Sequence, residues 1–382
     1  MKKELELYLH IPFCVSKCKY CDFLSAPSGE EQRQIYVERL CRRIRYWSDV
    51  IHNYGYEIVS IFVGGGTPSI LTEVQITQVF EAVHESFPIR EDAEITLEMN
   101  PGTDVKDKLP VYRELGINRL SMGLQSADNE ELKCLGRIHT YEDFRQVYQW
   151  AREAGFTNIN VDLMSAIPGQ TLESYEDTLR KVADLEPEHI SAYSLIIEEG
   201  TPFYERYGEG RHAEELPDED IERQMYVRTG EILEDYGYHR YEISNYAKDG
   251  YECRHNLGYW DRKEYLGLGA GASSLMDHIR WKEPDHIGPS TGLVLEERED
   301  FTRLRRKDEM EEFMFLGLRK INGVSEYDFY KSFRVSMDEI YKESIENLIK
   351  EGLLVREEDR IRLTDRGIDL SNYALSQFLL GE

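Results

Sequence analysis

The amino-acid sequence predicts an α/β fold, a partial (β/α)6 TIM-type barrel followed by a C-terminal winged-helix-like α+β domain. Six short β-rich runs alternate with longer helical patterns up to about residue 236. After residue 307 the pattern becomes helical and then ends in a short hairpin and a last helix. Repeated βα units form parallel sheets with right-handed crossovers, and a closed barrel needs about eight of them. On periodicity alone, an open doubly wound sheet is the alternative.

Each strand and helix of the array follows from a local pattern. The predicted strands span residues 5–10, 57–63, 94–99, 119–123, 158–163 and 189–195. Several are apolar without clean alternation, which is typical of strands covered on both faces. The predicted helices span residues 30–52, 73–87, 105–115, 141–153, 172–184 and 218–236. Turn signals follow several strands, at 64–68, 100–102, 168–169 and 200–202, where parallel α/β folds build their sites.

The rest of the chain divides into two further regions. Residues 237–300 are rich in Tyr, Gly and Asn and show little helical pattern. Helices are predicted at 309–319, 326–333 and 337–351, followed by a hairpin at 352–363 and a last helix from about residue 365. The predicted domains are therefore the barrel at 1–240, an extension at 241–300 and the winged-helix-like domain at 301–382.

The composition excludes several classes of protein. Of the 382 residues, 41% are hydrophobic and 31% are charged, which is typical of a globular protein with a sizeable core. No segment approaches the ~18–20 apolar residues that a membrane-spanning helix needs. The first residues lack an apolar run with a cleavage site, so no signal peptide is expected and the cytoplasm is the expected location.

The chain is strongly acidic. Its 73 Asp and Glu residues against 46 Lys and Arg residues give a net charge of −27. Such a surface repels phosphates, so no nucleic-acid partner is expected. A short basic run at residues 303–307 is interpreted as the exposed start of a helix. An acidic surface fits transient docking on a basic protein partner.

Three of the six cysteines lie within eight residues, in the loop predicted after the first strand. A disulfide framework is not expected in a long chain without a secretion signal. Cys14, Cys18 and Cys21 have the spacing CxxxCxxC, and no second CxxC pair completes a zinc ribbon. Three thiolates on one tight loop suit an iron–sulfur cluster with one iron left open. A single-metal site or a chance grouping of cysteines is the alternative.

This spacing at the opening of a βα array resembles the radical S-adenosylmethionine superfamily. The resemblance implies a [4Fe–4S] cluster held by the three cysteines, with the methionine amino and carboxylate groups of S-adenosylmethionine on the open iron. It also implies that Tyr20 packs near the adenine. The stretch with Gly65, Gly66 and Thr67 resembles the segment whose backbone receives the methionine amino group, because close backbone approach leaves no room for a Cβ. Alone, this stretch predicts only a turn.

The opening segment YLHIPFC, at residues 8–14, narrows the resemblance. Further motifs agree, at residues 98–101 (EMNP), 123–126 (GLQS), 135–139 (LGRIH) and 167–170 (IPGQ). Together they resemble the group of oxygen-independent coproporphyrinogen III oxidases and HemW-type haem chaperones. The resemblance implies that Tyr8, Glu98, Gln125, Arg137 and Asp162 line the S-adenosylmethionine pocket. On chemistry alone, capping of strand ends is the simpler role for the two carboxylates.

An HNxxYW motif at residues 255–260 is the hallmark of the HemW-type branch. The resemblance implies haem binding by His255, Asn256, Tyr259 and Trp260. Imidazole is a good axial ligand for haem iron, and aromatic faces suit a porphyrin plane. Cys253 is a second possible ligand. The alternative is structural: the polar pair hydrogen-bonds a buried loop and the aromatic pair fills the core.

The resemblance implies a haem chaperone that passes haem to an acceptor protein of unknown identity, with at most peripheral membrane contact through that acceptor. The alternative is an enzyme, a coproporphyrinogen dehydrogenase-like oxidoreductase that decarboxylates propionates. Phe23 stands where those oxidases have a fourth cysteine, and only a few residues precede the first predicted strand, so their N-terminal extension is not expected. A different radical reaction and a cluster-stabilised scaffold are the remaining hypotheses.

Overall fold

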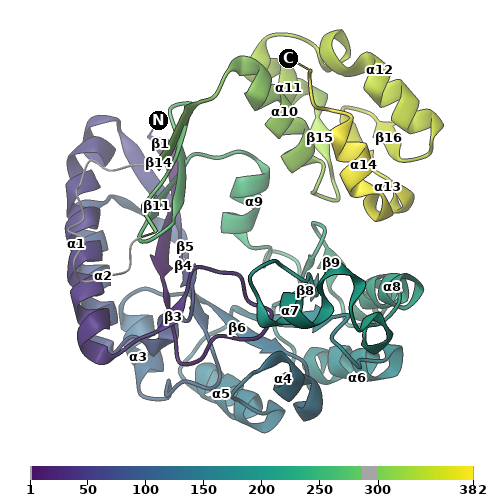
Figure 1. The fold of residues 1–382 in the computed structure, drawn as a ribbon. Coiled ribbons are helices and arrows are strands. Elements are labelled where there is room, and N and C mark those ends of the chain that lie inside the picture. The colour runs from purple at the N-terminus through teal and green to yellow at the C-terminus, as the bar shows by residue number, and fades with distance from the viewer. Residues whose placement is uncertain (1, 286–298, 382) are drawn as a thin grey trace.

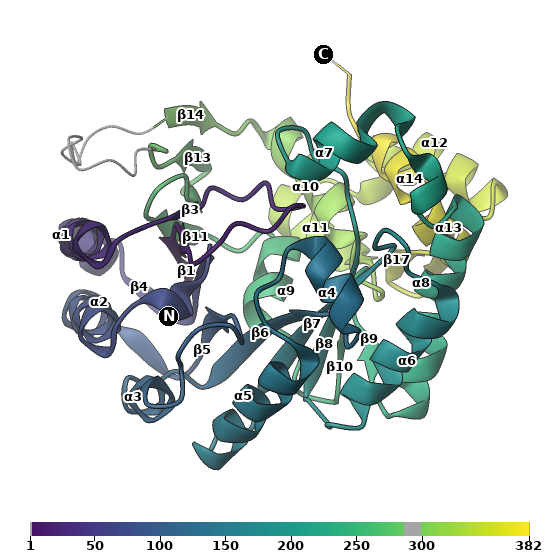
Figure 2. The same ribbon diagram turned by 60° about the horizontal axis from the view of Figure 1, so that its bottom comes forward.

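Six parallel strands in chain order form the wall of an incomplete barrel (Figure 1, Figure 2). They are β1 (Lys3–Ile11), β4 (Tyr56–Gly65), β5 (Ile89–Met99), β6 (Arg119–Gln125), β7 (Ile159–Ser165) and β8 (His189–Ser194), with a separate short pair of β2 (Phe13–Cys14) and β3 (Ala26–Pro27). The computed structural model describes residues 2–285 and 299–381. The strands follow sequence order without the reversal of a doubly wound sheet, so the predicted partial-barrel class is confirmed.

The connecting helices gather mostly around the outer face of the sheet (Figure 2). They are α1 (Glu30–Asn53), α2 (Glu73–Ser86), α3 (Lys108–Glu114), α4 (Asn129–Leu135), α5 (Tyr141–Glu153), α6 (Leu172–Ala183), α7 (Pro202–Tyr207) and α8 (Glu219–Asp235), with 3-10 turns at Pro68–Ile70, Gly208–Gly210 and Ala213–Glu215. The apolar stripe of α1, which includes Val37 and Ile44, shares one core with Leu7 and Leu9 of β1. Within the described part of the chain, no helix has the length and apolar character to cross a membrane.

The inner face of the barrel is polar. Because side chains alternate along a strand and the leucines of β1 join the core beneath the helices, Glu6, Tyr8 and His10 face the interior. The other strands add polar side chains to this interior: Ser60, Glu94, Glu98, Arg119, Ser121, Asn160, Asp162 and His189. All strands run the same way, so these side chains fall into one group at the carboxyl ends and one at the amino ends.

Strands from residues 237–300 extend both edges of the sheet. β11 (Tyr265–Leu268) pairs in parallel with β1, and β12 (Ser273–Met276), β13 (Ile279–Lys282) and β14 (Glu299–Arg303) continue by antiparallel pairing. β10 (Asn245–Ala247) and β9 (His239–Arg240) lie beyond β8. Such short strands show too few alternations to be recognised from the sequence pattern. Residues 286–298 of the predicted extension lie outside the described residues.

The C-terminal part has a hydrophobic core of its own. It contains α10 (Arg306–Gly317), α11 (Glu326–Phe333), α12 (Met337–Lys350), α13 (Asp365–Asp369) and α14 (Ser371–Ser376), with a small sheet of β15 (Val324–Ser325), β17 (Arg360–Leu363) and β16 (Leu354–Glu357). This order of helices and hairpin agrees with the predicted winged-helix-like pattern. Ion pairs join it to the barrel side, from Glu312 to Arg262 (3.0 Å) and Arg280 (2.7 Å) and from Asp369 to Arg223 (2.8 Å).

Candidate functional site

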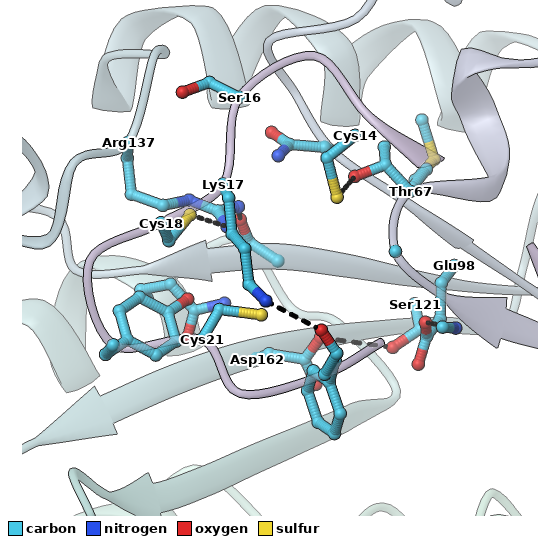
Figure 3. A pocket seen from close by; sticks show the side chains of 18 residues that line it. Cys14, Ser16, Lys17, Cys18, Cys21, Thr67, Glu98, Ser121, Arg137 and Asp162 are labelled. Atoms are coloured by element: carbon cyan, nitrogen blue, oxygen red, sulfur yellow. Dashed lines mark hydrogen bonds between the residues drawn. The ribbon is translucent and has the colours of Figure 1, made fainter. Parts of the chain in front are cut away.

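The three clustered cysteines line one cavity of about 150 Å³ at the carboxyl ends of the strands (Figure 3). Their loop runs between β2 and β3 and is held from outside, since the Lys19 N–H donates to the Leu135 carbonyl at 3.0 Å. The Thr67 hydroxyl donates to Cys14 Sγ at 3.4 Å. Burial, with the neighbouring sulfurs of Cys18 and Cys14, raises the pKa of the Cys21 thiol. A bound metal would lower the pKa of such a thiol and release its proton.

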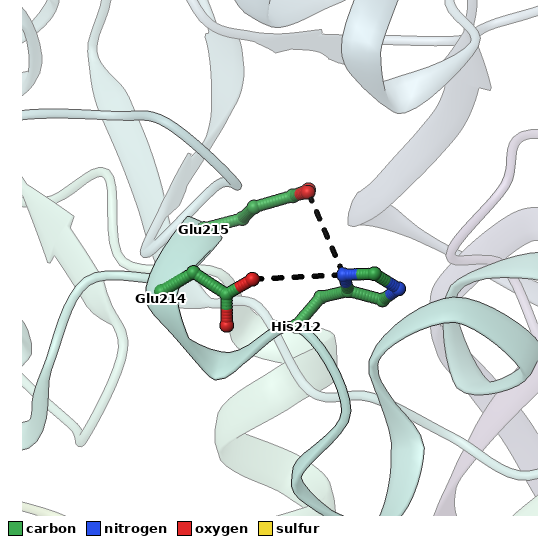
Figure 4. Close-up of side chains that lie close together, drawn as sticks. All are labelled: His212, Glu214 and Glu215. Carbon is green, nitrogen blue, oxygen red and sulfur yellow. Dashed lines mark ion pairs between the residues drawn. The ribbon is translucent and has the colours of Figure 1, made fainter.

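The three cysteine sulfurs do not all lie within 4.8 Å of one another. Among the described residues, the only group of three His, Cys, Asp or Glu ligand atoms that all lie within 4.8 Å of one another is at His212, Glu214 and Glu215. For comparison, two thiolates on one tetrahedral zinc lie about 3.8 Å apart. That exposed group, on the turn before α8 (Figure 4), is joined by contacts of 3.6 and 3.8 Å from the imidazole to the two carboxylates. Because Arg206 already pairs with Glu215 at 2.8 Å, we assign no metal site to the group of His212, Glu214 and Glu215.

The glycine-rich segment after β4 forms one wall of the cavity by lying directly on the end of β1. A Cβ on Gly65, whose φ is +114°, would lie 2.5 Å from the imidazole of His10. A Cβ on Gly66 would lie 2.6 Å from the carbonyl of Phe13. No other residue allows this approach without a shift of the backbone. The Gly65 N–H donates to Glu98 Oε2 at 3.1 Å.

Two carboxyl groups lie at the base of the cavity, Glu98 on β5 and Asp162 on β7. Burial and the charge of Asp162 raise the pKa of Glu98 to about 8, although the hydrogen bond from the Gly65 N–H lowers it. Burial also raises the pKa of Asp162, although Asn160 Nδ2 donates to it at 2.7 Å and the Ser121 hydroxyl at 3.3 Å. A cationic ligand group would favour the ionised carboxylates, so the site suits a bound amine.

The half-buried guanidinium of Arg137 faces these acids across the cavity. Arg137 Nη1 lies 3.5 Å from Cys18 Sγ, and Nη2 donates to the Gly123 carbonyl. Gln125, at the end of β6, lines the same cavity with a left-handed φ of +77°. A non-glycine residue in that region costs on the order of 1 kcal/mol or more and is a feature of functional sites. Tyr20 lies beside the guanidinium, and its burial raises the pKa of its hydroxyl.

The structure brings most of the predicted cofactor residues together. The cavity is lined by Tyr20, Gly65, Gly66, Thr67, Glu98, Gln125, Arg137 and Asp162. Tyr8 is not among them: its hydroxyl is bonded to His10 Nδ1 at 3.0 Å and its ring stacks on Phe62. The sequence analysis missed Ser121 and Gly123, which also line the cavity. Their signal was the period of two on β6, which places both on the same inward face as Gln125.

The four predicted haem residues lie on α9 (Arg254–Trp260), away from this cavity. α9 enters the barrel beside the amino-terminal halves of the strands, where the Glu94 carboxylate accepts the backbone N–H groups of Arg254 and His255 at 3.1 Å each. Both ring nitrogens of His255 are engaged, with the Ser60 hydroxyl at 2.8 Å and the Tyr259 hydroxyl at 3.1 Å.

His255 is enclosed on this helix, whereas Arg254 at its start is exposed. The His255 residue is 1% exposed, and its ring stacks on Phe62 with centroids 5.2 Å apart. Burial and the nearby Arg119 guanidinium lower the pKa of the imidazole to about 3, so it is neutral. Trp260 lies at the other end of the helix under the guanidinium of Arg319, and Asn256 is half-buried.

Comparison with known proteins decides the family. A radical SAM superfamily model matches residues 8–182, and a model of the HemN C-terminal domain matches residues 304–370. The heme chaperone HemW of Lactococcus lactis is 36% identical, covering 100% of this chain and 99% of that protein. This chain belongs to the HemW family of radical SAM proteins. The HemW proteins of Bacillus subtilis and Escherichia coli are each 35% identical, over 97% and 98% of this chain and 98% of their own.

A solved structure supports the fold. Coproporphyrinogen III oxidase (HemN) from Escherichia coli superposes with a TM-score of 0.86 at 23% identity, covering 99% of this chain and 90% of that one. At this identity the likeness concerns the fold alone.

The cavity fits the cofactors of a radical SAM protein. Three thiols of one short segment that line the same cavity suit a cluster in which each thiolate holds a separate iron. The cavity also contains two acids of raised pKa and a guanidinium whose Nε–H is buried without a partner. These groups match the amine and the carboxylate of a methionine moiety.

Proposed function

We propose that this protein is a haem chaperone, which binds haem and passes it to an acceptor protein. The observation that carries the proposal is the end-to-end likeness to heme chaperone HemW proteins, at 35–36% identity over nearly the whole of both chains. The oxidase reading has no comparable support, because the likeness to the solved oxidase concerns the fold alone. Phe23, which is 63% exposed at the mouth of the cavity, stands where the oxidases have a further cysteine.

In this proposal Cys14, Cys18 and Cys21 hold a [4Fe–4S] cluster. When bound, the cluster supplies an electron to the sulfonium of S-adenosylmethionine. The chain's own part is to place that cofactor. Glu98 receives the methionine amino group, which lowers the pKa of this buried acid and releases its proton.

The other cavity residues recognise the remaining groups of the cofactor. Arg137 faces the methionine carboxylate, Gln125 and Asp162 contact the ribose, and Tyr20 packs near the adenine. The family resemblance implies that these residues line the pocket, and their donors and acceptors support the individual roles. Tyr8 acts through His10, which it holds by a hydrogen bond of 3.0 Å.

Haem ligation by His255, with Asn256, Tyr259 and Trp260, stays part of the proposal and adds a requirement. Because both ring nitrogens are engaged, the imidazole has to leave Ser60 or Tyr259 before it ligates iron. The protein then acts in the cytoplasm on an acceptor yet to be identified, without nucleic acid.

We also propose the division into a barrel at 1–240, an extension at 241–300 and a C-terminal domain at 301–382.

The deciding experiment is anaerobic. Protein with a reconstituted cluster and S-adenosylmethionine is titrated with haem and followed by its Soret band, and a parallel sample receives coproporphyrinogen III and a reductant. A chaperone binds haem stoichiometrically and leaves the propionates intact by mass. Decarboxylation of the porphyrinogen would replace the proposal with the oxidase reading.

Variants at and around His255 on α9 test whether this histidine ligates the haem iron. His255→Ala is expected to weaken haem binding or shift the Soret band, and His84→Ala, on the exposed face of α2, serves as its control. Ser60→Ala leaves the ligand in place and removes one bond that closes it, so faster haem binding is expected. An unchanged spectrum and affinity in His255→Ala would exclude this histidine as a ligand.

A further inference from the structure

The segment that carries Arg137 is built onto the cysteine loop. α4 ends at Gly136, whose φ of +79° turns the chain back. The next residue is held there, since the Arg137 N–H donates to the Leu132 carbonyl at 2.9 Å. The Leu135 carbonyl receives the N–H of Lys19, the residue after Cys18, at 3.0 Å. The arginine and this cysteine are therefore positioned by one set of backbone contacts.

The guanidinium of Arg137 contacts both a cysteine sulfur and a strand of the barrel (Figure 3). Nη1 lies 3.5 Å from Cys18 Sγ, and Nη2 donates to the carbonyl of Gly123 on β6. Gly123 makes room for it, because a Cβ there would lie 3.0 Å from Nη2. The Nε–H is buried and has no hydrogen-bond partner. One guanidinium nitrogen thus contacts the thiol, one holds the side chain on β6, and Nε–H is left for a ligand.

The charge of this side chain is fixed, since arginine stays protonated in proteins. Hydrogen bonds and positive charge beside the cysteine sulfurs are among the factors that set the reduction potential of an iron–sulfur cluster. Reduction adds negative charge to the cluster, so a half-buried cation next to a ligating sulfur favours the reduced state. Lys17, the other cation that lines the cavity, is exposed and donates to the Phe23 carbonyl at 3.1 Å, not to a sulfur.

We propose that Arg137 is a positioning residue for the cluster as well as a cofactor contact: it donates to the Cys18 thiolate, raises the reduction potential of the cluster, and keeps Nε–H free for the cofactor carboxylate. The inference rests on the proposed cluster. It makes one guanidinium the link between cofactor binding and cluster reduction. Because such linkage is reciprocal, the oxidation state of the cluster and the affinity for S-adenosylmethionine influence each other through this residue.

The test is a potentiometric titration of the reconstituted cluster, monitored by electron paramagnetic resonance, first without S-adenosylmethionine. Arg137→Gln is expected to move the midpoint to more negative values by at least a tenfold change in the reduced-to-oxidised ratio, or about 59 mV for one electron. Arg137→Lys keeps the charge and loses the fork, so a smaller shift of the same sign is expected. Lys17→Gln, the matched control, is expected to shift the midpoint by less than half as much as Arg137→Gln.

The affinity for S-adenosylmethionine is then measured by equilibrium dialysis, and at least a tenfold loss is expected in Arg137→Gln. An unchanged midpoint with lost affinity would overturn the inference and leave Arg137 a cofactor contact only. If Arg137→Gln assembles no cluster, Arg137→Lys decides, and an unchanged midpoint there overturns the inference. A wild-type protein that binds no cluster would refute the proposed cofactor set instead.

Discussion

The two ends of the barrel interior use similar side chains from the same strands and arrive at opposite states. At the carboxyl ends, Glu98, Asp162 and Arg137 surround a cavity, and the guanidinium keeps an unpartnered N–H. At the amino ends, α9 fills the space, and both nitrogens of His255 are bonded. An unfilled group of buried donors and acceptors is costly unless a ligand completes it. The difference therefore lies in space more than in hydrogen bonding: the cavity is open to a ligand, whereas α9 fills the other end, although Glu6 Oε2 and Trp260 Nε1 there are also buried without a partner.

The largest expected effect is on the cluster. Replacement of Cys14, Cys18 or Cys21 by alanine is expected to abolish the visible absorbance of the reconstituted cluster, because each thiolate holds its own iron. The matched control is Cys253→Ala, a buried cysteine at the α9 end whose thiol donates to Glu94 at 3.5 Å. Full absorbance in any one loop variant would exclude that cysteine as a ligand, and loss of absorbance in the control would show that the cluster depends on the α9 end as well.

The next effect is steric and belongs to the α9 end. A Cβ on Gly258 would lie 1.9 Å from a carboxyl oxygen of Glu6, a residue that is 1% exposed. Gly258→Ala is therefore expected to lower the free energy of unfolding by about 1–3 kcal/mol, as overpacking of a core does. Urea unfolding measures this loss, and a double-mutant cycle with Glu6→Ala should relieve much of it.

Gly230→Ala on α8 is the control for that substitution, because its Cβ would meet nothing closer than the Tyr246 hydroxyl at 3.9 Å. It is expected to keep or slightly raise stability. Equal stabilities for the two alanine variants would mean that α9 is not packed tightly into the barrel.

The smallest effect over a single pH unit is a dependence of stability on pH. Burial raises the pKa of Glu6 from its ordinary value to about 8. Between the two values the folded protein holds a proton that the unfolded chain has lost, so stability falls as the pH rises towards 8 and changes no further above it. The slope contributed by one such group is at most about 1.4 kcal/mol per pH unit. Glu6→Gln is expected to remove that contribution.

Unfolding by urea at several pH values between 5 and 9 measures it. Burial also raises the pKa of Glu98 to about 8. Its contribution to the pH dependence should change when S-adenosylmethionine binds, while that of Glu6 should not. Parallel pH profiles for wild type and Glu6→Gln would show that this acid titrates normally in the folded protein.

The sequence alone determined the elements and the chemistry that depend on near neighbours. The six βα units, the C-terminal helices with their hairpin, and the CxxxCxxC loop can all be recognised within windows of a few residues, because hydrophobic periodicity and ligand spacing are local properties. The inner-face positions of β6 were also readable from the alternation of side chains along a strand.

Only the tertiary structure decided which distant residues meet. Contacts between residues far apart in the chain include the pairing of β11 with β1, the packing of α9 against Glu94 and Ser60, and the Arg137 contact with Cys18. The tertiary structure also decided that Tyr8 is not part of the cavity lining. Such contacts depend on how whole layers pack and on which buried polar groups can satisfy one another. The placement of the three cysteine sulfurs around one cavity is likewise set by the path of a folded loop.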